Sequence, residues 1–492
     1  MKLSKLIEKL EYTVVCGNDD CEVNELVYDS RKVAENDVFV CIKGAAFDGH
    51  QYISQVVGKK VAAIIVMEDV EDIEGVTVIK VEDTRLALAY MSAAFFGYPA
   101  EKLTTIGITG TKGKTTTSYM VRQVLEKVGI KTGLIGTIET IIGDVKIPSI
   151  NTTPESYIVQ QTFAKMVEKG IKCVVMEVSS QGLMLHRVAG FTFDYGIFTN
   201  IEPDHIGPNE HKDFEDYLNC KSMLLKQCKH GIVNIDDKHI EQVIKGHTCD
   251  LESYSIEKES DLKAENIELV TGPGFLGCKY NVRGLIDVDV EIHVPGMFSV
   301  YNSLCALAIC RHFTEDKEMI KKALLSVSVK GRVEIIKVSD RFTLMIDYAH
   351  NAMSLESLLN TLREYNPGRI VTLFGCGGNR SKDRRFNMGE VSAKLSDFTI
   401  VTSDNPRNEE PMDIIADIVT GIDRVGGEYA TVPDRKDAIR YAILNARDGD
   451  VIVLAGKGHE DYQEIKGVKH HMDERELVSE VISEPEVKAV LR

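Results

Sequence analysis

The sequence predicts an α/β protein of three domains, in which a mixed α/β domain precedes two domains built on parallel sheets. The chain has 492 residues, and about 150 residues per domain gives three domains with a core each. In the second and third domains, apolar runs typical of strands alternate with helical patterns, as in a parallel sheet covered by helices. Hydrophobic residues make up 43% of the chain and charged residues 27%, which excludes a disordered or fibrous protein.

The first domain is expected over residues 1–100. Short β-like runs at 37–42 and 61–66 are separated by polar turns, and a helical pattern follows at 84–96. Gly97 and Pro99 stop that helix and mark a linker.

The second domain, 101–330, and the third, 331–492, carry the alternating pattern. The second opens on an apolar strand at 103–109 that runs into glycines. The remaining expected strands lie at 173–178, 195–199, 343–347, 370–374, 398–402 and 451–455. The third domain is therefore predicted to be Rossmann-like.

Charge and cysteine usage restrict the partners and the compartment. Asp and Glu number 75 against 58 Lys and Arg, a net charge of −17, so we expect neither nucleic acid nor an anionic membrane as partner. No apolar run reaches the ~18 residues of a membrane span, and the charged N-terminus does not resemble a signal peptide. The 11 cysteines form no Cys-x-x-Cys pair, which favours reduced buried thiols over a zinc site. We expect a cytoplasmic monomer.

Polar or glycine-rich segments follow six of the expected strands. Ligands collect at the carboxyl ends of parallel strands, so these segments predict the functional site. They lie at 110–115, 176–180, 347–350, 375–378, 404–407 and 456–460.

Residues 109–117 predict a phosphate-binding loop between a strand and a helix. Glycines allow backbone N–H groups to surround phosphate oxygens at the N-terminus of the helix. Lys114 would reach the β- and γ-phosphates, and the Thr115 hydroxyl would bind Mg²⁺. Ile108 stands where the strict Walker pattern has glycine, so the loop is a variant in which Gly110 supplies the turn. ATP or GTP is expected at Gly110, Thr111, Lys112, Gly113, Lys114, Thr115 and Thr116.

Five other residues are ambiguous from the sequence alone. Glu177, at a strand end, suits a Mg²⁺ carboxylate or a structural one. His205 follows another strand end, and a lone histidine is more often structural than ligating. Lys221 reads as a solvated helix lysine, and Arg384 with Arg385 as a solvated basic patch.

Taken together, the motifs closely resemble those of the Mur ligases, ATP-dependent amide-forming enzymes of peptidoglycan synthesis. The resemblance spans nearly the whole chain, in family order. It rests on residues 29–31, 110–117, 151–154, 177–180, 204–205, 221, 347–350, 375–378, 404–407 and 456–460.

The resemblance implies a reaction. ATP phosphorylates the γ-carboxylate of D-Glu in UDP-MurNAc-L-Ala-D-Glu, and an incoming amine displaces phosphate from the acyl phosphate. By resemblance, Lys114, Glu177, His205 and Lys221 are catalytic. Thr115 and Glu177 hold one Mg²⁺, and His205 helps to hold a second with a carbamylated Lys221, whose carbamate supplies the oxygen ligand that this hard cation prefers. Further ATP contacts are implied for Asn302, Arg332, Asp347 and His350.

The resemblance also assigns the other two substrates. The uridine and muramoyl side, shared by the first two domains, would use Ser30, Asn151, Thr152, Thr153, Ser179 and Arg187. The sequence of residues 404–407 implies meso-diaminopimelate rather than L-lysine, because the guanidinium of Arg407 can pair with the second carboxylate. The implied amino-acid site comprises Arg385, Asp404, Asn405, Pro406, Arg407, Gly456 and Glu460.

Some positions depart from the family pattern, and other readings stay open. Gln181, Leu185, residues 206–211 and Asn351 differ from the usual residues. One alternative is a related ligase that adds another amino acid, such as L-lysine, or uses another acceptor. A second is a folylpolyglutamate or cyanophycin synthetase of the same chemistry. A third, of a different class, is a P-loop NTPase that acts as a switch. A nucleotide-sugar oxidoreductase built on residues 375–378 is weaker, because Arg380 occupies the last glycine position of the dinucleotide motif.

Overall fold

The computed structural model describes residues 1–44, 47–71, 73–207 and 210–491, and the chain forms two compact units. The first unit comprises Met1–Lys263 and Leu304–Glu315, and the second comprises Ala264–Ser303 and Asp316–Arg492. The predicted domain boundaries near residues 100 and 330 are finer than this division and stay a prediction.

The N-terminal part of the first unit is a mixed α/β structure, as expected. Its sheet has the order β1-β5-β4-β3-β2, in which only β1 is antiparallel to its neighbour. The predicted helix 84–96 is α3, which begins after Asp83 because that carboxylate accepts hydrogen bonds from the backbone N–H groups of Arg85 and Leu86. The elements are α1 Leu3–Leu6, β1 Thr13–Cys16, β2 Leu26–Val27, β3 Val38–Val40, η1 Gly49–Tyr52, α2 Ile53–Val57, β4 Ala63–Val66, β5 Thr77–Lys80, α3 Thr84–Phe95 and η2 Pro99–Lys102.

The rest of the first unit is centred on a parallel sheet of order β13-β12-β11-β6-β10-β7, to which β8 and β9 add an antiparallel edge. Its strands are apolar because both faces are covered. The elements are β6 Thr104–Thr109, α4 Lys114–Lys127, β7 Thr132–Ile135, β8 Glu139–Ile142, β9 Val145–Pro148, α5 Ser156–Glu168, β10 Cys173–Glu177, α6 Ser180–Met184, β11 Phe193–Phe198, α7 Phe214–Lys226, β12 Cys228–Asn234, α8 Ile240–Val243 and β13 Asp250–Ser255. Two elements, β14 Leu262–Gly272 and α9 Met297–Cys310, are divided between the units.

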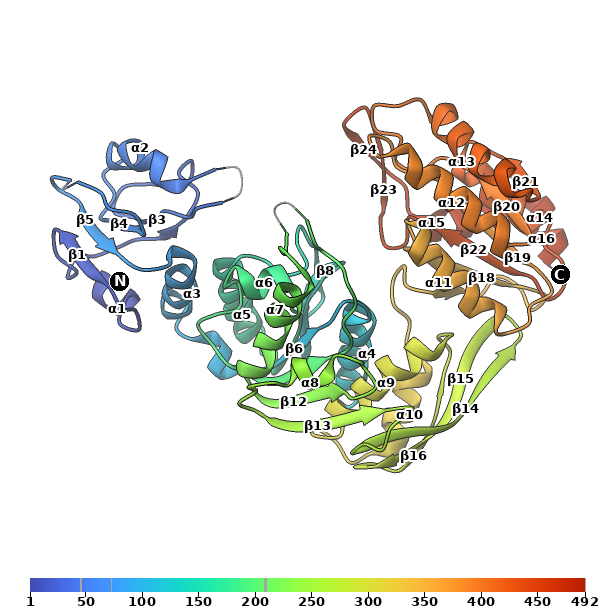
Figure 1. Cartoon of the computed structure of the whole chain (residues 1–492), viewed down its shortest axis with the longest axis horizontal. Helices are drawn as coiled ribbons and strands as arrows, with labels where there is room; N and C mark the ends of the chain where they lie inside the picture. Colours follow the sequence, from blue (N-terminus) through green and yellow to red (C-terminus); the bar gives the residue numbers. More distant parts are fainter. Residues whose placement is uncertain (45–46, 72, 208–209, 492) are drawn as a thin grey trace. The chain divides into compact units, whose positions relative to one another are not determined.

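The second unit contains a doubly wound sheet of order β17-β18-β22-β19-β20-β21, parallel except for β17 (Figure 1). Side chains of α11, α12 and α13 form the core on one face, and those of α14, α15 and α16 form it on the other. The elements are β15 Phe275–Gly284, β16 Val288–Ile292, α10 Lys317–Leu325, β17 Glu334–Ile336, β18 Thr343–Asp347, α11 Ala352–Arg363, β19 Ile370–Phe374, α12 Lys382–Leu395, β20 Phe398–Val401, α13 Pro411–Val425, β21 Tyr429–Thr431, α14 Arg435–Leu444, β22 Val451–Ala455, β23 Tyr462–Ile465, β24 Val468–His471, α15 Glu474–Ser483 and α16 Pro485–Leu491.

The parallel order brings the predicted motifs to common edges. In the first unit, the segments after β6, β10 and β11 lie at the carboxyl edge of the sheet. In the second, the carboxyl ends of β18, β22, β19 and β20 are neighbours in that order. Among the described residues, no helix is long and apolar enough to cross a membrane, and all 11 cysteines are free thiols.

Candidate active site

The predicted phosphate loop joins β6 to α4. Gly110 has φ 150° and Gly113 has φ 86°, the left-handed region that favours glycine. A Cβ on Gly110 would lie 1.9 Å from Thr199 Oγ1. Lys114 Nζ donates to the carbonyl oxygens of Gly110 and Thr111 at 2.7 and 3.1 Å. The lysine ammonium is therefore folded back over its own loop.

Asn200, which follows β11, organises this loop. Its carbonyl accepts from the backbone N–H of Thr111 at 2.9 Å, and its Oδ1 accepts from that of Lys112 at 2.9 Å. Its Nδ2 donates to the Lys112 carbonyl at 3.1 Å. Thr116 lies half-buried in the first turn of α4.

Glu177 ends β10 and is fully buried among hydroxyl groups. Its Oε2 accepts from Thr115 Oγ1 at 2.8 Å and from Thr137 Oγ1 at 2.9 Å, and its Oε1 accepts from Thr137 N–H at 2.9 Å. Thr152 Oγ1 lies 3.1 Å from Thr137 Oγ1. The two predicted ligands Thr115 and Glu177 are thus brought together in an all-oxygen cluster. Thr137 has no counterpart among the predicted site residues.

The predicted muramoyl-side residues adjoin this cluster. Thr153 Oγ1 donates to the Glu177 carbonyl and accepts from Ser179 N–H, both at 2.9 Å. Arg187 donates to the Thr153 carbonyl at 3.0 Å and to Glu155 Oε1 at 2.9 Å. Ser179 Oγ caps α6 by accepting from the backbone N–H of Gly182.

Two further predicted residues on this side are more accessible. Asn151 is exposed, and Ser30 is half-buried. The Ser30 carbonyl accepts from Lys59 Nζ at 2.9 Å.

Lys221 on α7 corrects the expectation of a solvated lysine. It is 2% exposed, and its Nζ donates to the Gly110 carbonyl at 2.8 Å. Burial and the nearby Lys114 ammonium lower the pKa of Lys221 well below its usual value. Lys221 is buried because it lies on the face of α7 that packs against the phosphate loop, and its neighbours in sequence do not indicate this contact.

Tyr217 sits one helical turn before Lys221 and joins several of these groups. Its hydroxyl lies 3.0 Å from Thr111 Oγ1, and Lys221 Nζ lies 4.7 Å from its ring centroid. The His205 ring centroid is 6.2 Å from that of Tyr217. Sequence reasoning missed Tyr217, although its four-residue spacing from Lys221 places both on one helix face.

His205 is half exposed, and its Nδ1 lies 3.2 Å from Glu210 Oε1. The neighbouring His211 is fully buried with Nδ1 2.9 Å from Asp216 Oδ2, and Cys220 lies beside this pair. Of the divergent run 206–211, residues 208 and 209 lie outside the described residues.

In the second unit, Asp347 ends β18 and is half-buried. Its carboxylate accepts from the backbone N–H groups of Val333 and Ala349, both at 2.8 Å. Burial raises the pKa of Asp347, although the nearby Arg332 opposes this. The Arg332 guanidinium carbon lies 5.1 Å from the Tyr348 ring centroid.

Two histidines flank Tyr348. The rings of His350 and His459 lie 4.5 and 4.6 Å from that of Tyr348. Burial lowers the pKa of His350, and burial with the Arg332 charge lowers that of His459 to about 4. Asn302 is buried in α9. Of the divergent positions, Asn351 caps α11 by accepting from Ser354 N–H at 2.8 Å.

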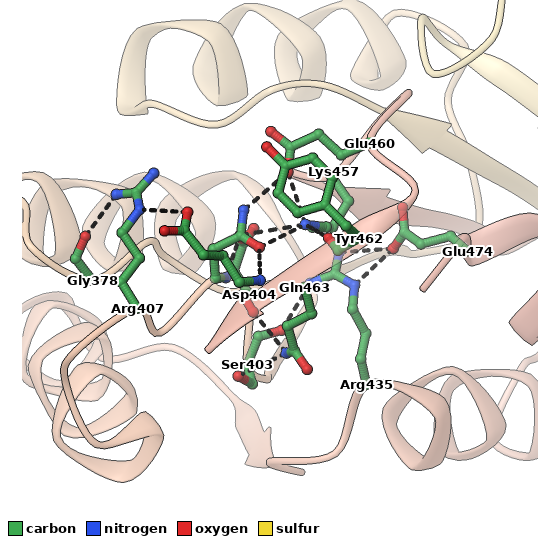
Figure 2. Close-up of polar contacts among 12 residues, drawn as sticks. Gly378, Ser403, Asp404, Arg407, Arg435, Lys457, Glu460, Tyr462, Gln463 and Glu474 are labelled. Carbon is green, nitrogen blue, oxygen red and sulfur yellow. Dashed lines mark hydrogen bonds and ion pairs between the residues drawn. The ribbon is translucent and has the colours of Figure 1, made fainter. Parts of the chain in front are cut away.

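The predicted amino-acid motif after β20 meets the segment after β22 (Figure 2). Asn405 Nδ2 donates to Glu460 Oε2 at 2.9 Å. The fully buried Lys457 donates to Asn405 Oδ1 at 3.0 Å and to Glu460 Oε2 at 2.8 Å. Gly456, with φ 103°, passes close to Asp404, whose Oδ2 would lie 3.1 Å from an added Cβ. Lys457 is a site residue that sequence reasoning missed.

Arg407 lies at the outer end of this motif, in the left-handed region with φ 52°. Its Nη1 donates to the Gly378 carbonyl at 2.7 Å, and its Nε to Glu464 Oε2 at 3.3 Å (Figure 2). Pro406 is buried, and its carbonyl would lie 1.9 Å from a Cβ on Gly378. The guanidinium is therefore held at a fixed place beside residues 375–378.

Arg385 corrects the expectation of a solvated patch. It is 1% exposed, and it pairs with Glu409 at 2.7 Å and Asp417 at 2.9 Å. Arg384 donates to the His350 carbonyl. The sequence missed this because Glu409 and Asp417 lie 24 and 32 residues further along the chain.

The fold and these sites define a nucleotide-dependent ligase: a phosphate loop with a buried carboxylate in one unit, and a doubly wound sheet with paired cationic and acidic groups in the other. Family models match three stretches of the chain. They are the Mur ligase family catalytic domain over residues 22–96, the Mur ligase middle domain over 108–310 and the Mur ligase glutamate ligase domain over 331–458.

Relatives that align over the whole chain support the same family. The UDP-N-acetylmuramoyl-L-alanyl-D-glutamate--2,6-diaminopimelate ligase of Clostridium perfringens is 43% identical over 98% of this chain and 99% of the relative. UDP-N-acetylmuramoyl-L-alanyl-D-glutamate--2,6-diaminopimelate ligase 1 of Clostridium acetobutylicum is 46% identical over 98% of this chain and 100% of the relative. A solved structure titled with that ligase name superposes with a TM-score of 0.74 at 25% identity, covering 98% and 99% of the two chains.

The chain belongs to the Mur ligase family, whose members are ATP-dependent ligases. The expected three-domain α/β fold is thereby confirmed. Because the family consists of ligases, its match excludes the two alternatives from other classes, a P-loop NTPase switch and a nucleotide-sugar oxidoreductase.

Proposed function

We propose that this chain joins meso-diaminopimelate to the D-Glu γ-carboxylate of UDP-MurNAc-L-Ala-D-Glu at the expense of ATP, in peptidoglycan biosynthesis. The observation that carries this proposal is the Asp404 to Arg407 loop, which holds a guanidinium and an acidic cluster at one strand edge. Relatives that share this chain's full length are named for this reaction.

ATP occupies the loop from Gly110 to Thr116 in this proposal. Lys114, already held against its loop, offsets the negative charge of the β- and γ-phosphates. By resemblance, we propose further nucleotide contacts for Asn302, Arg332, Asp347 and His350. Arg332 contributes the positive charge, and Asp347 stays fixed by its two backbone hydrogen bonds.

The donors around Glu177 fit a magnesium ion. Thr115 and Glu177 supply a hydroxyl and a carboxylate, and these hard oxygen ligands suit Mg²⁺. His205 and a carbamylated Lys221 would hold a second Mg²⁺. When bound, the ion would neutralise charge on the transferred phosphoryl group.

Burial supports the carbamylation of Lys221. A neutral amine adds to CO₂ and releases one proton, which leaves an anionic carbamate on Nζ. Its lowered pKa keeps Lys221 neutral enough to react. The carbamate anion would also lie favourably beside the Lys114 ammonium, whose charge lowers the pKa of Lys221.

The muramoyl dipeptide would lie along Ser30, Asn151, Thr152, Thr153, Ser179 and Arg187. Thr153 and Ser179 are used within the protein, so their role is to shape the site around Glu177. Arg187 supplies positive charge for an anionic substrate, and Asn151 supplies an exposed amide.

Diaminopimelate would be held at its distal end, where it differs from lysine by one carboxylate. Arg407 pairs with that carboxylate, and Glu460 accepts from the neighbouring ammonium. Arg385, Asp404, Asn405, Pro406 and Gly456 hold these two groups in position.

The reaction then follows from charge and position. A γ-carboxylate oxygen of D-Glu bonds to the γ-phosphorus of ATP, and ADP leaves. The free amine bonds to the acyl carbon, the C–O bond to phosphate breaks, and one proton is released. We also propose that the protein acts as a cytoplasmic monomer without a nucleic-acid partner.

A product analysis tests the proposal. The purified chain is incubated with ATP, magnesium, UDP-MurNAc-L-Ala-D-Glu and meso-diaminopimelate, and the products are analysed by mass spectrometry. We expect the UDP-linked tripeptide together with ADP and phosphate. ADP formation without the tripeptide would contradict the proposal.

A further inference from the structure

Lys457 is a fully buried cation inside the motif 456–460, and neither the predicted site residues nor the proposed reaction gives it a role. It is 0% exposed, and a buried ammonium is costly unless it is paired and hydrogen-bonded. Its Nζ donates to Asn405 Oδ1 at 3.0 Å, to Glu460 Oε2 at 2.8 Å and to the Tyr462 carbonyl. All three donor hydrogens of the ammonium therefore have acceptors.

These contacts divide the oxygens of Glu460 between two tasks. Oε2 accepts from both Lys457 Nζ and Asn405 Nδ2. Oε1 is 3.4 Å from the Tyr348 hydroxyl, a long hydrogen bond. Lys457 thus fixes one oxygen and leaves the other as the more available acceptor for a substrate ammonium.

The same cation offsets the acidity of the pocket. Asp404 Oδ1 lies 4.0 Å from Lys457 Nζ, and Glu460 Oε2 lies 2.8 Å from the same atom. Two carboxylates against one ammonium leave a charge of −1, which matches one ammonium group of an amino acid. Without Lys457, the buried carboxylate of Asp404 and the half-buried carboxylate of Glu460 would lack this neutralising charge.

We propose that Lys457 is a positioning residue for the amino-acid substrate: it orients Glu460 and Asn405 so that one carboxylate oxygen faces the substrate ammonium. This inference rests on the proposed function, because it concerns the diaminopimelate end of that site. Figure 2 shows Lys457 together with Glu460 and Asp404.

The proposal predicts a pH effect on substrate affinity. Burial raises the pKa of Glu460, but the Lys457 ammonium and the Asn405 amide outweigh it, so the pKa lies below its usual value. The other titratable groups facing Glu460 are Tyr348, His459, Asp404 and Tyr462. Removing the Lys457 charge leaves burial dominant, and the Glu460 carboxylate would take up a proton at a higher pH.

Lys457→Met tests this, with Lys457→Gln as a variant that keeps a donor without the charge. Lys469→Met is the matched control. Lys469 is an exposed lysine, and its Nζ lies 3.9 Å from the ring centroid of Tyr462, the residue whose carbonyl accepts from Lys457. For Lys457→Met we expect at least a tenfold higher KM for meso-diaminopimelate, an unchanged KM for ATP, and a KM that rises with acidification at a higher pH than in wild type. For Lys457→Gln we expect a KM for meso-diaminopimelate between those of wild type and Lys457→Met, and for Lys469→Met we expect the wild-type KM.

The outcomes separate this inference from the proposed function. Wild-type protein without diaminopimelate-dependent turnover would overturn both. An active wild type with a KM for diaminopimelate changed less than twofold in Lys457→Met would overturn the inference alone. Equal rises in both KM values, or an unshifted pH profile, would assign Lys457 to general stability and likewise overturn it.

Discussion

At the scale of single residues, the chemistry depends on side chains whose burial the sequence does not show. Lys221 and Arg385 read as solvated from their neighbours in sequence, yet both are buried and bonded to distant residues. Glu177 was identifiable because it ends an apolar strand. Its hydroxyl partner Thr137 was not, since it comes from a different strand end.

Lys221→Ala should abolish most of the ligase activity. The substitution removes the amine that would be carbamylated, and loss of a charged group at a phosphoryl-transfer site costs on the order of 10²–10³ in rate. Turnover measured with added acetate or formate should recover part of the activity. Full activity of the variant without added carboxylate would remove Lys221 from the site.

Arg407→Ala should weaken use of diaminopimelate much more than use of ATP. Hydrogen bonds to a charged group contribute about 1.5–3 kcal/mol, so KM for diaminopimelate should rise ~10–100-fold. Steady-state kinetics with each substrate varied in turn measure this. Arg424→Ala, which removes an exposed arginine paired with Glu390 in the same unit, serves as control. A matching loss in ATP affinity would contradict the role given to Arg407.

At the scale of elements, most of the parallel strands were predictable within one or two residues. The runs 343–347, 370–374 and 451–455 coincide with β18, β19 and β22, because buried parallel strands are continuous apolar runs. The predicted helix after the phosphate loop is α4. The antiparallel strands β15 and β16 were not predicted, since their alternation of buried and exposed residues gives a weaker signal.

Gly378→Ala should damage the amino-acid site through the backbone. An added Cβ would lie 1.9 Å from the Pro406 carbonyl oxygen, so the loop that carries Arg407 must move. Misplacement by about 1 Å can cost ~10²-fold, and we expect a loss of that size in kcat/KM for diaminopimelate. Gly377→Ala is the matched control, because its nearest neighbour would lie at 3.5 Å. Equal kinetics for the two variants would show that the loop tolerates the shift.

At the scale of the whole molecule, the sequence predicted a three-domain α/β fold, and the match to a solved structure confirms that fold. The contacts divide the chain into two compact units, and residues 264–303 and 316–330 of the predicted second domain lie in the second unit, so the predicted domain boundaries stay a prediction. The net charge of −17 is compatible with anionic substrates, because it need not be spread evenly over the molecule. Lys114, Arg187, Arg332 and Arg407 lie at the proposed substrate sites, so the excess acidity must be carried elsewhere.

Stability against acid should depend on His459. Its pKa is about 4 in the folded protein and about 6.5 when unfolded, so the unfolded chain binds more protons between these values. The free energy of unfolding therefore falls as the pH drops from 6.5 toward 4. In urea denaturation of the second unit, His459→Phe should lose about 2 kcal/mol less than wild type between pH 7 and pH 5. The exposed His470→Phe is the control, and identical pH dependence in wild type and His459→Phe would contradict the prediction.

Acceptor dependence of phosphate release tests the central claim most directly. Release is measured with ATP and UDP-MurNAc-L-Ala-D-Glu in three parallel reactions, with meso-diaminopimelate, with L-lysine and with neither amino acid. We predict rapid release with diaminopimelate, at least tenfold slower release with lysine and almost none without an amino acid. Release independent of both amino acids, or faster with lysine, would contradict the account.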